Sequence, residues 1–253
     1  MIRCIRKLFT LAVVLVLLAA FGYSVVLPRV LPLQYQDIVE QYAAEYGLEE
    51  AFVYGVIFCE SHFEPDVISS ADAVGLMQVT EETGKWAAAQ MGLDPATIDL
   101  TDPDTNIHIG CWYLSWLTEK FGGVSETVLA GYNAGHGSVA RWLADEEMSW
   151  DGITLDEIPY EETKSYVKRV KLAEQAYRLR LRLQAYLEET PLGVYADRTA
   201  DLEGNEDDEK KGFSPFADFL PWAWRLWQER RSKRRRKTTA TEENRQLHPK
   251  TQC

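Results

Sequence analysis

The sequence predicts a mainly α-helical protein with one transmembrane helix near its N-terminus. Between residues 33 and 189, apolar residues recur three or four positions apart, and the strict alternation typical of strands is rare. Hydrophobic residues make up 46% of the 253 residues and aromatic residues 11%, which is enough for a packed core. Residues 8–27 are almost purely apolar, and a helix of about 20 such residues can span a bilayer.

The N-terminal segment carries the features of an uncleaved membrane anchor. Arg3, Arg6 and Lys7 precede the apolar run, which predicts a cytoplasmic N-terminus and an extracytoplasmic domain behind it. A cleaved signal peptide is the competing interpretation, but it would have a shorter apolar region and an A-x-A site after it. Pro28 and Pro32 are expected to break the helix. We therefore expect a single-pass protein of the cell membrane.

The rest of the folded region is expected to consist of successive helices. The segments with helical spacing are 35–46, 49–62, part of 71–92, 104–121, 125–135, 139–147 and 161–189. Ser125 is expected to cap the helix that it begins. The expected buried face of the last helix consists of Val167, Val170, Leu172, Ala173, Ala176 and Tyr177.

Charge is divided unevenly along the chain. The net charge is −12, but both ends carry basic clusters, so the acidic residues gather in the central region. Because this region would repel phosphates, nucleic-acid binding is excluded. Residues 191–212 read as an acidic linker, and 213–253 as an aromatic and basic tail containing the run RRSKRRRK. This tail suits a membrane interface, where anionic lipid is the partner, or an anionic wall polymer; a solvated tail without a partner is an equal alternative.

The four cysteines predict no metal site. Cys4, Cys59, Cys111 and Cys253 show neither CxxC spacing nor His partners at zinc-ligand spacing. Cys59 and Cys111 lie in apolar helical contexts, which favours two buried thiols over a disulfide. No Gly-rich phosphate loop is present either, so we expect no cofactor.

One carboxyl group stands out on the predicted helix 49–62. The helix has an apolar stripe that includes Val56 and Ile57, and Glu60 falls on the same face, four and three positions later. A carboxyl group at the edge of an apolar face loses hydration, which raises its pKa toward the value that a general acid needs. By itself this pattern is weak, because a Glu at a helix end is more often a solvated residue.

Five short motifs in one order give Glu60 its context. They are E-S-H-F at 60–63, G-L-M-Q at 75–78, N-I-x-x-G at 106–110, G-Y-N-A-G at 131–135 and E-T-x-x-Y-V at 162–167. In this order and spacing, the set resembles the soluble lytic transglycosylase family, whose catalytic domain is similar to goose-type lysozyme. The resemblance covers roughly residues 34–186. It departs from the family's common pattern at Thr80-Glu81, where a hydrophobic residue and Pro are usual, and at Gly131, where Ala is usual.

The resemblance implies a lysozyme-like helical domain at 33–190 with a long saccharide groove, behind the basic end and anchor at 1–30. It implies peptidoglycan glycan strands as the substrate. Members of the family cleave the β-1,4 bond between N-acetylmuramic acid and N-acetylglucosamine without net addition of water, and they leave a 1,6-anhydro end.

Individual roles follow from the same resemblance. Glu60 matches the single catalytic residue. The residues matching substrate-binding positions are Ser69, Gly75, Gln78, Tyr132 and, with a less specific match, Glu162. Ser69 and Gln78 also suit purely structural roles, in a turn and at a helix end.

A mechanism with one carboxyl group follows, and two alternatives stand beside it. Glu60 would protonate the leaving oxygen and then accept the proton of the sugar's 6-hydroxyl, while Tyr132 orients the acetamido group or Glu60. A goose-type hydrolase is one alternative, with Asp66 or Asp72 as candidates for the second carboxylate that activates water. A non-catalytic wall-binding scaffold with the same fold is the other.

Overall fold

The computed structural model describes residues 2–189. The acidic linker predicted at 191–212 and the tail predicted at 213–253 lie outside the described residues. The helical fold class predicted from the sequence is confirmed within the described part of the chain.

The N-terminal segment is one nearly continuous helical stretch. It comprises α1 (Ile2–Phe21), a π-helical turn η1 (Gly22–Val26) and α2 (Leu27–Val30). The stretch Arg3–Val30 has 28 residues and a mean hydropathy of 2.5 in its most apolar window, so its length and composition suffice to cross a membrane. Pro28 does not end the helix as predicted, because it stands in the first turn of α2, where its missing N–H does no harm.

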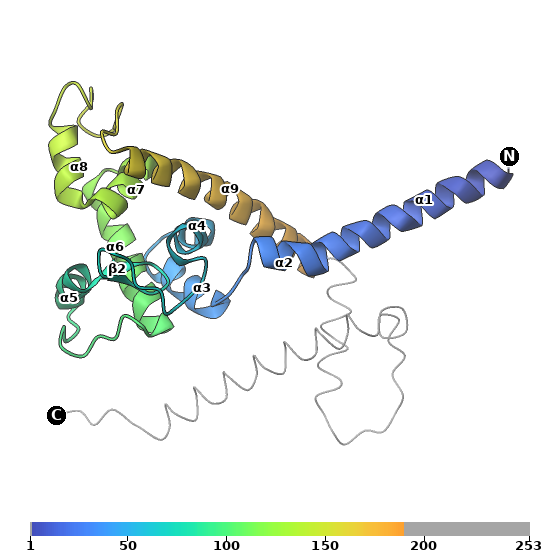
Figure 1. The fold of residues 1–253 in the computed structure, drawn as a ribbon, viewed down its shortest axis with the longest axis horizontal. Coiled ribbons are helices and arrows are strands. Elements are labelled where there is room, and N and C mark those ends of the chain that lie inside the picture. Colours follow the sequence, from blue (N-terminus) through green and yellow to red (C-terminus); the bar gives the residue numbers. More distant parts are fainter. Residues whose placement is uncertain (1, 190–253) are drawn as a thin grey trace, which may run out of the picture. The chain divides into compact units, whose positions relative to one another are not determined.

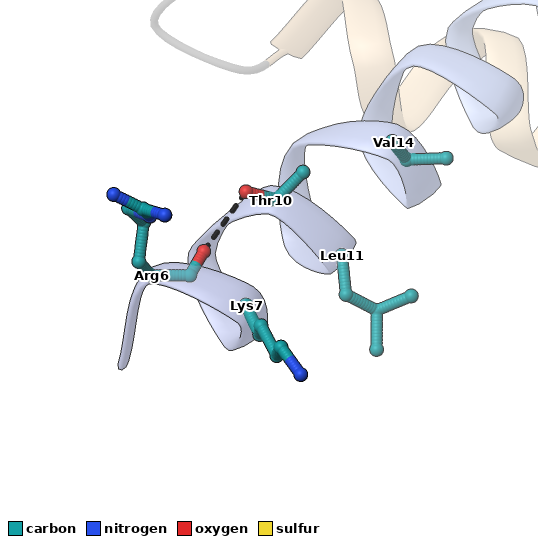
Figure 2. Close-up of a pocket in the computed structure, with 5 residues that line it drawn as sticks. All are labelled: Arg6, Lys7, Thr10, Leu11 and Val14. Carbon is teal, nitrogen blue, oxygen red and sulfur yellow. Dashed lines mark hydrogen bonds between the residues drawn. The ribbon is translucent and has the colours of Figure 1, made fainter. Parts of the chain in front are cut away.

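The basic end of α1 forms a shallow hollow on one side of the helix. Figure 2 shows its lining, which consists of Arg6, Lys7, Thr10, Leu11 and Val14. The hydroxyl of Thr10 donates a hydrogen bond of 2.9 Å to the carbonyl oxygen of Arg6, one turn earlier. All five residues come from one helix and none is a carboxylic acid or a nucleophilic thiol, so this hollow is not a candidate active site.

The domain that follows contains most of the helices (Figure 1). Its elements are α3 (Gln36–Glu45), α4 (Glu50–Ser61), β1 (Ala73–Val74), β2 (Val79–Thr80), α5 (Glu81–Gln90), α6 (Pro103–Lys120), α7 (Ser125–Ala134), α8 (His136–Leu143) and α9 (Glu161–Glu189). Helix α6 packs against α3, α5 and α7. Helix α4 is the core helix, since every residue from Ala51 to Ile57 is buried.

Helices α4 and α9 approach each other closely at Gly55. A Cβ atom added there would lie 3.0 Å from the backbone nitrogen of Glu174 and 3.2 Å from the carbonyl oxygen of Val170. Only glycine allows the two backbones to come this close without displacement. This contact fixes which turn of α9 faces the C-terminal turn of α4.

The predicted buried face of α9 is right in most positions and wrong in one. Val167, Val170, Ala173 and Tyr177 are buried, and Ala176 is half-buried. Leu172 is 70% exposed, because it lies two residues after Val170 and therefore on nearly the opposite side of the helix.

Three local features differ from the sequence prediction. Strands β1 and β2 pair antiparallel, with Ala73 opposite Thr80, in a segment where only a polar turn and a helix were expected. Helix α8 begins three residues earlier than predicted, since Gly135, at φ 83°, redirects the chain directly after α7. Ser125 does not cap α7; Val124 holds the N-cap position and the Ser125 hydroxyl accepts a hydrogen bond from Lys171.

Candidate active site

Glu60 lies in the last turn of the buried helix α4. The helix ends at His62, which adopts a left-handed conformation with φ 51°. The neighbouring Ser61 is buried, and its hydroxyl donates a hydrogen bond of 2.8 Å to the carbonyl oxygen of Leu76. This bond ties the end of α4 to the β1–β2 hairpin, so Glu60 is held where the helix meets the hairpin.

The carboxyl group of Glu60 is shielded by protein, although the residue is partly exposed. Burial raises its pKa from 4.5 to about 7. A hydrogen bond from Tyr166 and the positive charge of Arg169 oppose this rise in part. The raised pKa brings the protonated form of Glu60, which a general acid requires, within reach at neutral pH.

Tyr166, on α9, is the direct partner of Glu60. Its hydroxyl donates a hydrogen bond of 2.7 Å to Oε1 of Glu60. Burial and the nearby Glu60 hold the pKa of Tyr166 well above its ordinary value, so the hydroxyl keeps its proton and acts as a donor. Sequence reasoning gave Tyr166 no role beyond membership of the E-T-x-x-Y-V motif. Its position on the buried face of α9 was the available signal, since a buried tyrosine hydroxyl requires a partner.

Tyr132, on α7, lies beside the same carboxyl group but has another hydrogen-bond partner. The charge of Glu60 contributes to the raised pKa of Tyr132, which places the two groups near each other. The Tyr132 hydroxyl donates a hydrogen bond of 2.7 Å to the carbonyl oxygen of Met77. In the described residues, the hydrogen bond to Glu60 thus belongs to Tyr166, while Tyr132 connects α7 to the hairpin.

The segment that contains the β1–β2 hairpin carries three more predicted site residues, which are Ser69, Gly75 and Gln78. The Ser69 hydroxyl oxygen accepts hydrogen bonds from the backbone N–H groups of Ala71 and Ala73 at 3.2 and 3.1 Å. The Gln78 side chain donates to the carbonyl oxygens of Val67 and Gly75 at 3.0 and 2.9 Å. These bonds do not use the hydroxyl hydrogen of Ser69 or the amide oxygen of Gln78, and both atoms suit sugar hydroxyl and amide groups.

Gly75 is buried and has a structural reason to be glycine. Its φ is 79°, a left-handed conformation, and a Cβ atom there would lie 2.6 Å from the carbonyl oxygen of Leu100 and closer still to Asn106. The side chain of Asn106 fills this space. It accepts from the backbone N–H of Met77 at 2.8 Å and donates to the carbonyl oxygens of Val74 and Leu100, each at 2.8 Å.

Asn106 therefore fixes the hairpin against α6, a role that the sequence analysis did not assign. The residue is fully buried. Its only sequence signal was its place in the N-I-x-x-G motif at 106–110.

Glu162 stands apart from the other predicted site residues. It is exposed in the first turn of α9, and among the contacts of residues 2–189 none joins it to Glu60, Gln78 or Tyr132. Its neighbour Thr163 donates a hydrogen bond of 2.7 Å to Oδ1 of Asn133, which ties the start of α9 to the end of α7.

The cysteines near the site are thiols. Cys59 and Cys111 are both free; Cys111 is buried as predicted, whereas Cys59 is only half-buried. Burial raises the pKa of the Cys59 thiol to about 11, so it is protonated and unreactive at neutral pH. In the described part of the chain, no three His, Cys, Asp or Glu side chains come together to hold a metal ion.

The fold and the site define a lysozyme-like helical domain in which the carboxyl group of Glu60 is shielded and has a raised pKa. Residues 37–150 match the family described as the transglycosylase SLT domain. Over these residues, the chain is similar to the SLT-type lytic transglycosylases.

Relatives and solved structures show the same similarity. The chain is 34% identical over 149 residues to the soluble lytic murein transglycosylase of Escherichia coli K12, covering 58% of this chain and 23% of the relative. It is 31% identical over 175 residues to the membrane-bound lytic murein transglycosylase C of Serratia proteamaculans, covering 58% and 47%. The structure of an inactive mutant of lytic transglycosylase Slt from Pseudomonas aeruginosa matches with a TM-score of 0.55 and 31% identity, over 62% of this chain and 26% of that one.

The shared region is a fraction of each relative. The chain spans about a quarter of the soluble relative and about half of the membrane-bound one.

Proposed function

We propose that the chain is a peptidoglycan lytic transglycosylase that cleaves the β-1,4 bond between N-acetylmuramic acid and N-acetylglucosamine and leaves a 1,6-anhydro end. The observation that carries the proposal is the shielded carboxyl group of Glu60, whose pKa is raised to about 7 and whose Oε1 accepts a hydrogen bond from the Tyr166 hydroxyl. The family assignment and the names of the relatives support the same substrate.

In the first step, Glu60 acts as the general acid. The protonated carboxyl group gives its proton to the glycosidic oxygen as the bond to the anomeric carbon breaks. Positive charge develops on the muramic acid ring, and the oxygen of its own 2-acetamido group can meet this charge. Tyr166 holds Oε1 of Glu60, which leaves Oε2 to carry the transferred proton.

In the second step, the same residue acts as the base. Glu60, now a carboxylate, accepts the proton of the sugar's 6-hydroxyl while that oxygen bonds to the anomeric carbon. The proton lost in the first step is thereby regained, and no water is added. The Tyr166 hydroxyl bond and the charge of Arg169 both stabilise the carboxylate that forms in the first step, and burial, which raises the pKa, favours its taking up a proton again in the second.

Hydrolysis is the alternative reaction, and the surroundings of Glu60 do not favour it. A hydrolase needs a second carboxylate to activate water. Asp66 and Asp72 are both exposed, and Asp72 occupies a turn with φ 57°. Among the described residues, the groups that shift the pKa of Glu60 are Tyr166 and Arg169, and neither aspartate is one of them.

We further propose that the protein acts as a single-pass membrane protein with its domain outside the cytoplasm. Arg3–Val30 is long and apolar enough to span the bilayer, and Arg3, Arg6 and Lys7 lie at its N-terminal end, the end that the positive-inside rule assigns to the cytoplasm. The residues assigned to substrate binding, which are Ser69, Gly75, Gln78, Tyr132 and Glu162, would then lie on the wall side of the membrane. The basic tail at 213–253 would bind anionic lipid or wall polymer.

Product analysis tests the reaction. The full chain in detergent micelles is incubated with purified sacculi, and the released muropeptides are identified by their masses in mass spectrometry. Anhydro-muramic acid ends are expected, and reducing muramic acid ends would contradict the proposal and favour the hydrolase. Glu60→Gln should lower the release rate about a hundredfold or more while sacculus binding stays close to that of the wild type. Glu64→Gln removes an exposed carboxyl group four residues away and serves as the matched control.

A further inference from the structure

A cluster of partly exposed aromatic rings lies next to the catalytic region and has no role in the steps above. We call it the Trp86 platform; it consists of Trp86 on α5, Trp112 and Trp116 on α6, and His136 at the start of α8. The ring centroid of Trp86 lies 5.4 Å from that of Trp112 and 4.9 Å from that of Trp116, both edge to face. The ring of His136 lies within 26° of parallel to Trp86, with centroids 6.2 Å apart.

The platform is more exposed than a packing core would be. All three tryptophans are partly exposed and His136 is exposed, whereas the neighbouring Tyr113 is buried. Within the described residues, the indole N–H groups of the three tryptophans have no hydrogen-bond acceptor, and none is buried without one, so they face solvent. Apolar rings with free donors at the surface are costly in water and typical of a binding surface.

The platform continues directly from the cleavage site. The ring of Tyr132, which lies beside Glu60, is 5.5 Å from that of Tyr113. Tyr113 in turn lies 6.0 Å from Trp116, nearly parallel to it, and 6.1 Å from Trp86. One buried ring therefore separates Tyr132 from the platform.

The chemistry of the platform matches a sugar ring. One face of a pyranose presents C–H groups that pack on an aromatic face, while its hydroxyl and acetamido oxygens accept hydrogen bonds from N–H donors. Partial desolvation and the adjacent Lys120 lower the pKa of His136, which favours its uncharged form. The Lys120 ammonium lies 4.9 Å from the centroid of the Trp116 ring and adds a donor for sugar oxygens.

We propose that the Trp86 platform binds a sugar of the glycan strand outside the pair of sugars that flank the cleaved bond. This inference rests on the proposed function for the identity of the strand. It assigns to Trp86, Trp116 and His136 the binding of long strands without a part in bond cleavage.

Calorimetric titration of peptide-free glycan strands tests the platform. The full chain carrying Glu60→Gln, in detergent micelles, is titrated with long strands and with the GlcNAc–MurNAc disaccharide. Trp86→Ala and His136→Ala, each added to this background, should weaken binding of the long strands about two- to tenfold and leave disaccharide binding unchanged. Trp150→Ala, which removes a 90% exposed tryptophan, is the matched control and should change neither affinity.

The design separates folding from binding. If Trp86→Ala strongly lowers the midpoint of thermal unfolding, the test uses two milder variants, which are His136→Ala at an exposed residue and the conservative Trp86→Phe. Their affinity for long strands then shows whether the platform binds sugar. Unchanged long-strand affinity in both would overturn the platform and leave its rings to a partner of other chemistry. If the wild type releases no anhydro ends and these variants still weaken strand binding, the proposed reaction fails and the platform stands. If it releases them and binding is unaffected, only the platform fails.

Discussion

At the scale of single residues, the protonation of Glu60 is a balance between burial and two stabilising neighbours. Burial disfavours the carboxylate, while the Tyr166 hydroxyl and the Arg169 charge favour it, and the resulting pKa is about 7. A residue that first gives and then accepts a proton works best with a pKa near the working pH, because either form is then within easy reach.

The pH dependence of the reaction follows from this pKa. The first step needs protonated Glu60, so the rate of muropeptide release should fall about tenfold per pH unit above pH 7. Initial rates on sacculi between pH 5 and pH 9 would measure this fall, which is the alkaline limb of the pH profile. A rate that stays level up to pH 9 would show that the protonated form of Glu60 is not required.

Stability should depend on pH through the same group. The pKa of Glu60 in the folded protein lies above the ordinary value of 4.5. The stability that protonated Glu60 gives relative to the ionised form is therefore fully present below about pH 4.5 and is lost as pH rises through about 7. Ionised Glu60 then costs up to about 3 kcal/mol of folding free energy. Glu60→Gln removes this cost, and its unfolding midpoint should exceed that of the wild type at pH 8.5 but not at pH 5. An equal difference at both pH values would contradict a raised pKa.

Tyr166 should tune Glu60 without reacting itself. Tyr166→Phe removes the hydrogen bond that favours the carboxylate, so the pKa of Glu60 should rise by about one unit and the alkaline limb should move upward with it. The maximal rate should fall, because Glu60 with a higher pKa is a weaker acid toward the glycosidic oxygen and has lost the hydrogen bond that positions Oε1. Tyr132→Phe removes a hydroxyl bonded to Met77, and its alkaline limb should stay close to that of the wild type. Identical limbs in Tyr166→Phe and the wild type would exclude the positioning role.

At the scale of elements, the hairpin that carries Gln78 depends on one buried amide. Asn106→Ala would leave the N–H of Met77 and the carbonyl oxygens of Val74 and Leu100 without their partner. The free energy of unfolding should fall by about 3 kcal/mol or more, measured by denaturant titration. Asn133→Ala removes an exposed amide with one bond, to Thr163, and should cost about 1 kcal/mol. Equal losses in the two variants would show that Asn106 does not hold the hairpin.

The sequence predicts long elements well and short ones poorly, for physical reasons. Helix α9 has the predicted bounds because its periodicity persists over 29 residues. Strands β1 and β2 have two residues each, too few for an alternation signal, and their pairing depends on Asn106 from α6. Leu172 was assigned to the buried face of α9 but is exposed, because it lies about 200° around the helix from Val170.

The candidate site shows the same division between local and distant information. Glu60 was found from its helical face, which is local, and from the motif order, which is read directly along the sequence. Its partner Tyr166 lies 106 residues further along the chain, and the pairing follows from the close packing of α4 and α9 at Gly55. The sequence carries no simple signal for a contact of this kind, because any buried tyrosine requires some partner.

At the scale of the whole molecule, the anchor and the domain should separate in function. Deleting residues 1–30 removes the apolar stretch and leaves every residue of α3–α9 in place, so the variant should move from the membrane fraction to the soluble fraction. Its rate of muropeptide release from sacculi in solution should match that of the full chain, since Glu60, Tyr132 and Tyr166 lie after the deletion. Fractionation of cells followed by immunoblotting measures the first outcome.

The segment 213–253 is a second candidate for membrane attachment. If a variant without residues 1–30 stays with membranes, the aromatic and basic segment at 213–253 is the remaining candidate for attachment, and deleting both regions should then release the protein. A high-salt wash distinguishes the two modes of attachment, because salt weakens a basic tail on anionic lipid and leaves a spanning helix in place. Full-length protein should therefore resist the wash, and its release by salt alone would contradict a membrane-spanning anchor.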